Sequence, residues 1–195
     1  LRDAERCLEG PSDEMVIVDE EQYRTLPARI AFARAYNAQS QRDYVSTVKY
    51  AELVFNLIPE ENHFLRAQTA VILGATYWAN GNLEAACRSL SDWIESALKV
   101  GNFIFAIAGA SGKADILTAQ GHLREALRTL QQSLQLASKR EMEAQWVTAQ
   151  NYLGVGMLYH EMGDDEAAAL HIQKSFVLGD QFIRVDWPYR KNLAQ

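Results

Sequence analysis

Gly109 to Lys113 is the first segment of this chain whose residue types could do chemistry, because GASGK is similar to part of a phosphate-binding loop. A Walker A loop needs a glycine five residues before Gly112 and a serine or threonine after the lysine. The chain has Ile107 and Ala114 at these places, and the segment lies within a predicted helix. We therefore predict no nucleotide site here.

The other candidates for chemistry are as weak. Ser46 and Lys49 have the spacing of an SxxK nucleophile motif, but the companion motifs of that enzyme class are missing and the pair lies on a predicted helix. The four histidines never lie three or four residues apart, so they form no metal-binding pair on a helix: His63, His122, His160 and His171. The sequence predicts no catalytic residues, no metal, no cofactor and no enzymatic activity.

The charge balance bears on the class of partner. The chain has 19 Lys and Arg against 25 Asp and Glu, a formal net charge of -6, so its surface as a whole should repel nucleic acid and anionic lipid. No apolar run reaches the roughly 18 residues that a membrane span needs. Cys7 and Cys87 show no ligand spacing and are expected to be reduced thiols. We expect a cytoplasmic protein that contacts neither nucleic acid nor membrane directly.

The elements that would position a binding site are helices arranged in repeats. The motif GNLEAA at Gly81 recurs as GHLREA at Gly121 and GDDEAA at Gly163, with separations of 40 and 42 residues, and a weaker copy begins at Arg42, 39 residues before the first. Apolar helical patterns lie on both sides of each glycine. Each glycine therefore marks a turn at which a left-handed residue closes one helix before the next begins.

This pattern predicts an all-α fold, a right-handed solenoid of helix-turn-helix repeats with a concave inner face. The predicted helices span residues 1–9, 27–40, 43–58, 62–79, 82–100, 103–119, 122–139, 142–162 and 164–180.

We interpret residues 1–195 as a single repeat domain cut from a longer chain. In this interpretation the end of a preceding repeat (1–9) and a loop (10–25) come before about four helix pairs (26–185) and the start of a further repeat (186–195). The chain would thus begin and end inside a repeat.

The repeat signature resembles a known family. Glycine, tyrosine and alanine recur around each turn as in tetratricopeptide repeats: Gly74, Tyr77, Gly81, Ala86, Gly121, Ala126, Gly156, Tyr159, Gly163 and Ala168. The period of 39 to 42 is longer than the usual one, and the phrases FLRAQTAVILGATYWANGNLEAA, ILTAQGHLREAL and DWPYRKNLAQ are similar to the sensor domain of MalT-like, LuxR-family ATP-dependent transcriptional regulators. Such regulators carry a P-loop ATPase before the repeats and a helix-turn-helix DNA-binding domain after them.

The resemblance implies where a ligand would bind. In such solenoids the first helix of each pair lines the concave groove, with residues 13, 10, 6, 3 and 2 before the turn facing inward. Carried onto this sequence, these positions predict a binding surface that includes Phe32, Tyr36, Gln68, Trp78, Ser111, Asp115, Thr118, Gln150, Met157 and His160, with Arg29 and Gln39 in the same series. The same side chains could instead pack against the next repeat.

The function that the resemblance implies is sensing. A small-molecule inducer or a regulatory protein in the groove would control self-association of a bacterial transcription activator and DNA binding by its other domains. The alternative is a peptide-binding scaffold with no transcriptional role. Three departures mark degenerate repeats: Lys113 stands where the pattern has leucine or valine, Arg34 does so in the first helix pair, and Arg42 replaces the turn glycine of that pair.

Overall fold

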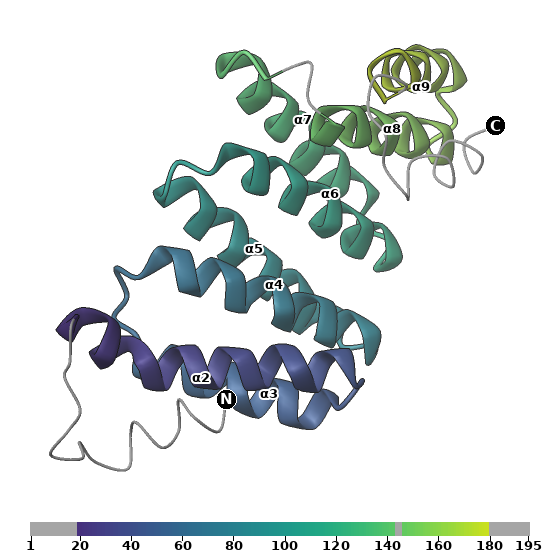
Figure 1. The fold of residues 1–195 in the computed structure, drawn as a ribbon. Helices are drawn as coiled ribbons and strands as arrows, with labels where there is room; N and C mark the ends of the chain where they lie inside the picture. Colours follow the sequence, from purple (N-terminus) through teal and green to yellow (C-terminus); the bar gives the residue numbers. More distant parts are fainter. Residues whose placement is uncertain (1–18, 143–145, 180–195) are drawn as a thin grey trace, which may run out of the picture. The chain divides into compact units, whose positions relative to one another are not determined.

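All regular structure in the described part of the chain is helical. The computed structural model describes residues 19–142 and 146–179, and these ranges hold no strand, which confirms the prediction of an all-α fold (Figure 1). In chain order the helices are α2 (Glu20–Ser40), α3 (Tyr44–Leu57), α4 (His63–Ala79), α5 (Leu83–Lys99), α6 (Phe103–Ala119), α7 (Leu123–Lys139), α8 (Trp146–Glu161) and α9 (Asp165–Gly179). The helix predicted over 1–9 and the segment predicted from 186 lie outside the described residues.

The helix bounds from α3 to α7 lie within one residue of those predicted, because turn-forming residues punctuate the chain between these helices: glycine at three of the turns, and asparagine or aspartate as the cap of most of the helices that follow. The start of α2 is different. The sequence places a loop over residues 10–25 and a helix from 27, since proline favours the first turn of a helix. In the structure α2 begins at Glu20, and Pro27 lies inside it. The carboxylate of Asp19 accepts a hydrogen bond from the backbone N–H of Gln22 (2.8 Å) and so begins the helix earlier.

The joints between helices follow one design. Gly81, Gly101, Gly121 and Gly163 have φ between 71° and 82°, and at each joint the next residue donates its backbone N–H to a carbonyl near the end of the preceding helix, as Asn82 does to Tyr77 (2.8 Å). Asn82 then caps the next helix by accepting a hydrogen bond from the N–H of Ala85 (3.1 Å). One short piece of chain therefore ends one helix and begins another.

Arg42 takes the glycine's place at the first joint and is itself left-handed, with φ of 60°. Asp43, which follows it, caps α3 by accepting from the N–H of Ser46 (3.0 Å). The hydroxyl and the backbone N–H of Ser46 hold the pKa of the Asp43 carboxyl below its ordinary value of 3.8. The degenerate turn thus keeps the backbone geometry of the others.

The chain divides into two compact units, residues 1–92 and residues 93–195, and each is described by itself. In the first unit, α2, α3 and α4 pack around two apolar clusters. One holds Ala28, Ala31, Val54, Ile58 and Leu65, with Phe32 against it. The other holds Ala35, Ala51 and Leu73, with Val48, Tyr50, Phe55 and Tyr77 against it. These clusters set the distance between α2 and α4.

In the second unit, α6, α7 and α8 pack around Ile107, Ala137 and Val147, and α9 packs on α8 through Ile172 and Phe176. Small residues bring these helices close together. A Cβ atom added to Gly156 would lie 2.6 Å from Cγ1 of Ile172 and 3.1 Å from the backbone oxygen of Ala168. Only glycine fits at this contact between α8 and α9.

Candidate functional site

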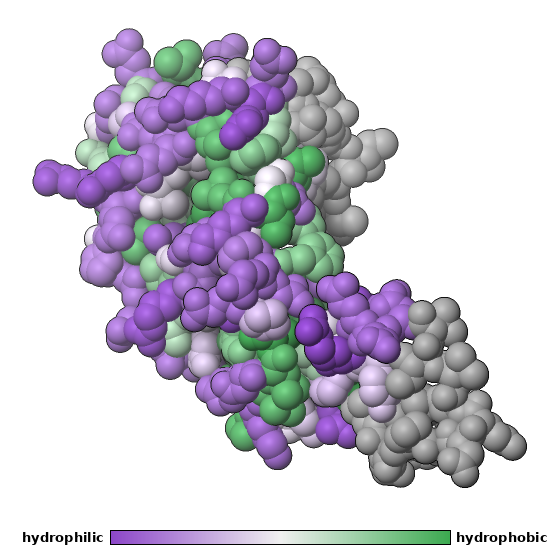
Figure 2. Space-filling view, turned by 90° about the vertical axis from the view of Figure 1, so that its left-hand side faces the viewer, coloured by the Kyte–Doolittle hydropathy of each residue, from purple (hydrophilic) through white to green (hydrophobic). Residues whose placement is uncertain are grey.

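A groove in the first unit lies between the N-terminal halves of α2 and α4. Its volume is about 510 Å³, within the range of small-molecule and peptide sites. We call it the α2–α4 groove, and its lining consists of Asp19, Glu21, Gln22, Thr25, Arg29, Phe32, Asn62, Phe64, Leu65 and Gln68. Figure 2 views the molecule from the side on which α2 and α4 begin, where hydrophobic patches lie between hydrophilic side chains.

The groove opens because α2 is longer than α4 at this end. The repeat offset of 39 residues sets the first turn of α2 opposite residues 59–62, which form the turn before α4 rather than a helix. At the other end the two helices are tied together. The side-chain amide of Gln39 donates to the backbone oxygen of Ile72 (3.1 Å) on α4. Gln39, which the sequence places on the binding face, is thus engaged in holding the helices.

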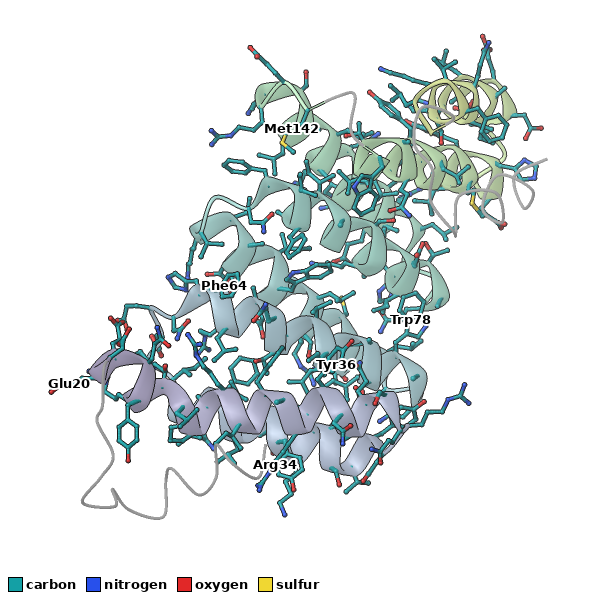
Figure 3. All side chains as sticks on the ribbon, in the orientation of Figure 1. Glu20, Arg34, Tyr36, Phe64, Trp78 and Met142 are labelled. Carbon is teal, nitrogen blue, oxygen red and sulfur yellow. The ribbon has the colours of Figure 1, made fainter. Side chains whose placement is uncertain are left out.

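Two phenylalanines supply the apolar part of the groove. Phe32 on α2 is half-buried against the first core cluster, whereas Phe64 on α4 is 60% exposed. Figure 3 shows Phe64 near the start of α4, on the same side of the unit as Glu20. An exposed aromatic ring beside a fixed one can hold an apolar side chain or stack on a planar group.

Unpaired polar groups lie beside these rings. Arg29 has no hydrogen bond or ion pair with any residue of the described part, and neither has Gln68, its counterpart on α4. The rim carries Asp19 and Glu21, although one oxygen of Asp19 already caps α2. The groove therefore offers the exposed guanidinium of Arg29 and the half-buried amide of Gln68 as donors, and the carboxylates of Asp19 and Glu21 as acceptors.

Part of the predicted binding surface lines this groove. The sequence placed Arg29, Phe32 and Gln68 on one face, and the structure brings them together in the α2–α4 groove. It missed Phe64 and Thr25, which lie four residues before Gln68 and Arg29. Since residues four apart share a helix face, one more step along the same face would have found both.

Tyr36 and Trp78 belong to the predicted surface but do not line the groove. They are 62% and 41% exposed and lie toward the C-terminal ends of α2 and α4, away from Phe64 (Figure 3). Both rings are exposed to solvent on the same two helices, outside the groove. The predicted face in this unit is thus divided into an open groove and an exposed aromatic end.

The predicted surface residues of the second unit differ in exposure. Met157 is 42% exposed, and His160 is exposed with its Nδ1 2.8 Å from Oδ1 of Asp165. Asp115 and Thr118 are half-buried, and the Thr118 hydroxyl donates to the backbone oxygen of Ala114 (2.8 Å). Ser111 and Gln150 are buried, each 7% exposed. These two side chains are enclosed by the packing of the unit.

The structure also places the candidates that the sequence set aside. Gly109 to Lys113 lies inside α6, and Ser46 and Lys49 lie on α3. Across residues 19–142 and 146–179, no three side chains of His, Cys, Asp and Glu gather as metal ligands would. None of the helices described is both long enough and apolar enough to cross a membrane. Cys87 is half-buried and forms no disulfide with a described residue, and Cys7 lies outside the described residues.

With this geometry in hand, comparisons with known proteins identify the repeats. A family model described as the MalT-like TPR region matches residues 28–194. The chain belongs to this family. MalT-like TPR regions are helical repeats of the tetratricopeptide type, and the match covers α2 from residue 28 onward and the whole of α4. No curated protein matches the chain.

Solved structures agree on the fold. The crystal structure of MamA protein is similar with a TM-score of 0.60 at 18% sequence identity, over 86% of this chain and 80% of that one. Two further MamA structures, described as MamA MSR-1 C2 and MamA AMB-1 P212121, align at TM-scores of 0.38 and 0.35 and identities of 14% and 16%, over 82% and 88% of this chain and 98% of each of theirs. The predicted all-α fold of tetratricopeptide-like repeats, the solenoid class, is confirmed.

Proposed function

We propose that this MalT-like TPR region is the signal-sensing and protein-interaction domain of a bacterial, cytoplasmic transcription activator, and that its α2–α4 groove binds the inducer or regulatory partner. The observation that carries the proposal is Arg29, which has no hydrogen bond or ion pair with any described residue and lines one groove with Phe32 and Phe64, on the first helices of neighbouring repeats. Family membership supports the sensing role. Bound ligand would favour one arrangement of the repeats and so control self-association and DNA binding by flanking ATPase and helix-turn-helix domains.

The groove suits a short peptide segment of a partner protein. An apolar side chain would lie between Phe32 and Phe64, and an acceptor such as a carboxylate or a backbone carbonyl would take hydrogen bonds from Arg29 and Gln68. A basic residue of the segment would reach the acidic rim at Glu21. A small polar inducer with one apolar face could use the same groups.

A peptide selection tests the groove directly. Peptides selected from a displayed library on the whole chain should lose about tenfold or more in affinity on Arg29→Glu, because a charge-assisted hydrogen bond contributes about 1.5–3 kcal/mol. Arg24→Glu is the matched control, since Arg24 is exposed on the same helix and does not line the groove. Fluorescence polarisation measures both. Equal losses in the two variants would refute the groove as the site.

The contribution of the phenylalanine rings of the groove is tested with a separate variant and its own control. Phe64→Ala should weaken the same peptides by about 1 kcal/mol or more, as expected for a ring at the centre of an interface. Leu57→Ala removes a comparably exposed apolar side chain, 45% exposed on α3, and should change nothing.

The transcriptional role needs a separate readout. In a reporter assay of the parent protein, Arg29→Glu should abolish the response to the inducing signal and leave basal expression unchanged. Peptide binding that depends on Arg29, combined with a normal reporter response in the variant, would instead favour the alternative of a peptide-binding scaffold with no transcriptional role.

A further inference from the structure

The second unit contains a pocket that the α2–α4 groove does not explain. It lies among the C-terminal half of α5, α6 and α7, and its volume is about 350 Å³. We call it the Lys113 pocket. Ile94, Leu98 and Leu136 line it together with two buried alanines of α6, Ala106 and Ala110, which are 2% and 4% exposed and form its floor. Most of this lining is apolar.

The pocket exists because one repeat lacks bulk that its neighbours have. Eight residues before the joint glycine, the neighbouring repeats carry Leu73 and Val155, which are 6% and 0% exposed, whereas this repeat carries Lys113. A lysine keeps its charged end toward water and does not fill an apolar space as leucine or valine does. The sequence departure at Lys113 and the unfilled space thus coincide.

Two further positions add to the space. Eleven residues before the joint glycine this repeat has Ala110, as the preceding repeat has Ala70, whereas the next repeat has Tyr152. Twelve residues after it, this repeat has Ser133, as the next repeat has Ser175, whereas the preceding one has Trp93. Both Ala110 and Ser133 line the pocket. All three positions carry small or polar residues around the pocket, and Lys113 is the one that differs from both neighbouring repeats.

The polar groups of the pocket are donors. Lys113 is half-buried and has no hydrogen bond or ion pair with any described residue, and the exposed amide of Gln132 is likewise unengaged. The hydroxyl hydrogen of Thr129 is already donated to the backbone oxygen of Glu125 (2.9 Å). The oxygen of Ser133 accepts from the buried amide of Asn151 (2.6 Å). A ligand must therefore bring acceptors.

The charges of the pocket lining also favour a ligand that brings acceptors. No aspartate or glutamate lines the Lys113 pocket, in contrast to the α2–α4 groove with its acidic rim. A cation beside an apolar enclosure, without an anionic neighbour in the lining, attracts an anion whose remaining surface is apolar. A carboxylate provides four lone-pair sites to receive hydrogen bonds from Lys113 and Gln132.

We propose that the Lys113 pocket binds a small monocarboxylic acid with an apolar body, its carboxylate beside Lys113 and its apolar body against Ile94, Leu98 and Leu136 over the alanine floor. This site is separate from the α2–α4 groove and does not depend on the function proposed for that groove.

Titration of the whole chain with octanoate tests the proposal, with 1-octanol as the matched probe that keeps the apolar body and lacks the charge. Calorimetry should give saturable binding of one octanoate, and 1-octanol should bind at least about tenfold more weakly. In methyl NMR spectra the shifts should be confined to Ile94, Leu98, Leu136 and their neighbours. Failure to saturate, equal affinity for the two probes, or shifts elsewhere would overturn the proposal.

Variants locate the site. Lys113→Met keeps an apolar stem and should weaken octanoate binding by about tenfold or more, while Lys139→Met, at an exposed lysine of α7, should have no effect. Thr129→Leu fills the pocket from a half-buried position and should abolish binding even if Lys113→Met alters folding. Unchanged affinity in Lys113→Met or in Thr129→Leu would overturn the proposal. So would a loss of octanoate binding in Arg29→Glu, which would place the site in the first unit.

Discussion

Gly156→Ala gives the sharpest test of how α8 and α9 pack. The added Cβ would lie 2.6 Å from Cγ1 of Ile172 and 3.1 Å from both the backbone nitrogen of Ile172 and the backbone oxygen of Ala168. Two of these three neighbours are backbone atoms of α9, so rotation of a side chain cannot make room. The two helices must move apart, which opens the contact along their length.

The size of the effect follows from two opposing contributions. Overpacking a close contact costs about 1–3 kcal/mol, and because two of the neighbours are backbone atoms we expect the upper part of this range, about 2–3 kcal/mol. Replacing glycine by alanine in a helix returns about 1 kcal/mol, so the net loss should be about 1–2 kcal/mol. Gly154 on the same helix is the matched control. There the added Cβ would meet only Leu130, with Cδ1 at 2.8 Å, and this is the end of a flexible side chain. Gly154→Ala should therefore be nearly neutral.

Thermal unfolding followed by circular dichroism separates the two variants. A chain of this size shifts by about 2–4 °C per kcal/mol, so Gly156→Ala should melt about 2–8 °C below the wild type, with Gly154→Ala close to it. A Gly156→Ala variant as stable as Gly154→Ala would show that the approach of α8 to α9 does not limit the side chain at this position, and the packing argument would be refuted.

Two further predictions concern the degenerate joint. Arg42→Gly should raise the free energy of unfolding by about 0.5 kcal/mol in urea titrations, since φ of 60° strains any residue except glycine; no gain would mean that Arg42 is not strained. Asp43→Asn keeps a capping oxygen but cannot titrate. Because the folded pKa of Asp43 is lowered, its contribution is present above pH 3.8 and lost as the pH falls further, so the melting temperatures of wild type and variant should differ less at pH 3 than at pH 7, and a constant difference would contradict the assigned cause.

The sequence was sufficient for the elements because their punctuation is local. A glycine followed by asparagine or aspartate specifies the turn and the next cap within a few residues, so Gly81 and Gly163 fixed helix ends without knowledge of packing. The predicted start of α2 near Pro27 was wrong because it, too, relied on a local signal. Pro27 is a local signal for a helix start, but the cap at Asp19 adds seven helical residues before it, from Glu20 to Leu26.

The groove could be predicted only in part because it depends on how two helices are offset. Helical spacing placed Phe32 and Gln68 on one face, but the opening arises from the extra turns of α2, and these depend on the start that the sequence missed. The burial of individual predicted site residues could also be learned only from the structure. Ser111 and Gln150 have the spacing of inward-facing residues, yet both are enclosed, and spacing alone cannot distinguish a helix face that lines a groove from one that packs.

The shared design of the joints has a consequence for how such a chain can grow. At Gly81, Gly121 and Gly163 a left-handed glycine and the backbone hydrogen bond of the next residue end one helix, and at Gly81 and Gly163 the side chain of that next residue also caps the following helix. A duplicated segment that runs from one of these glycines to the next would meet this same connection at both of its ends. The number of repeats can therefore change in whole units without new connecting chemistry, while each copy is free to acquire its own surface, as the third has done at Lys113.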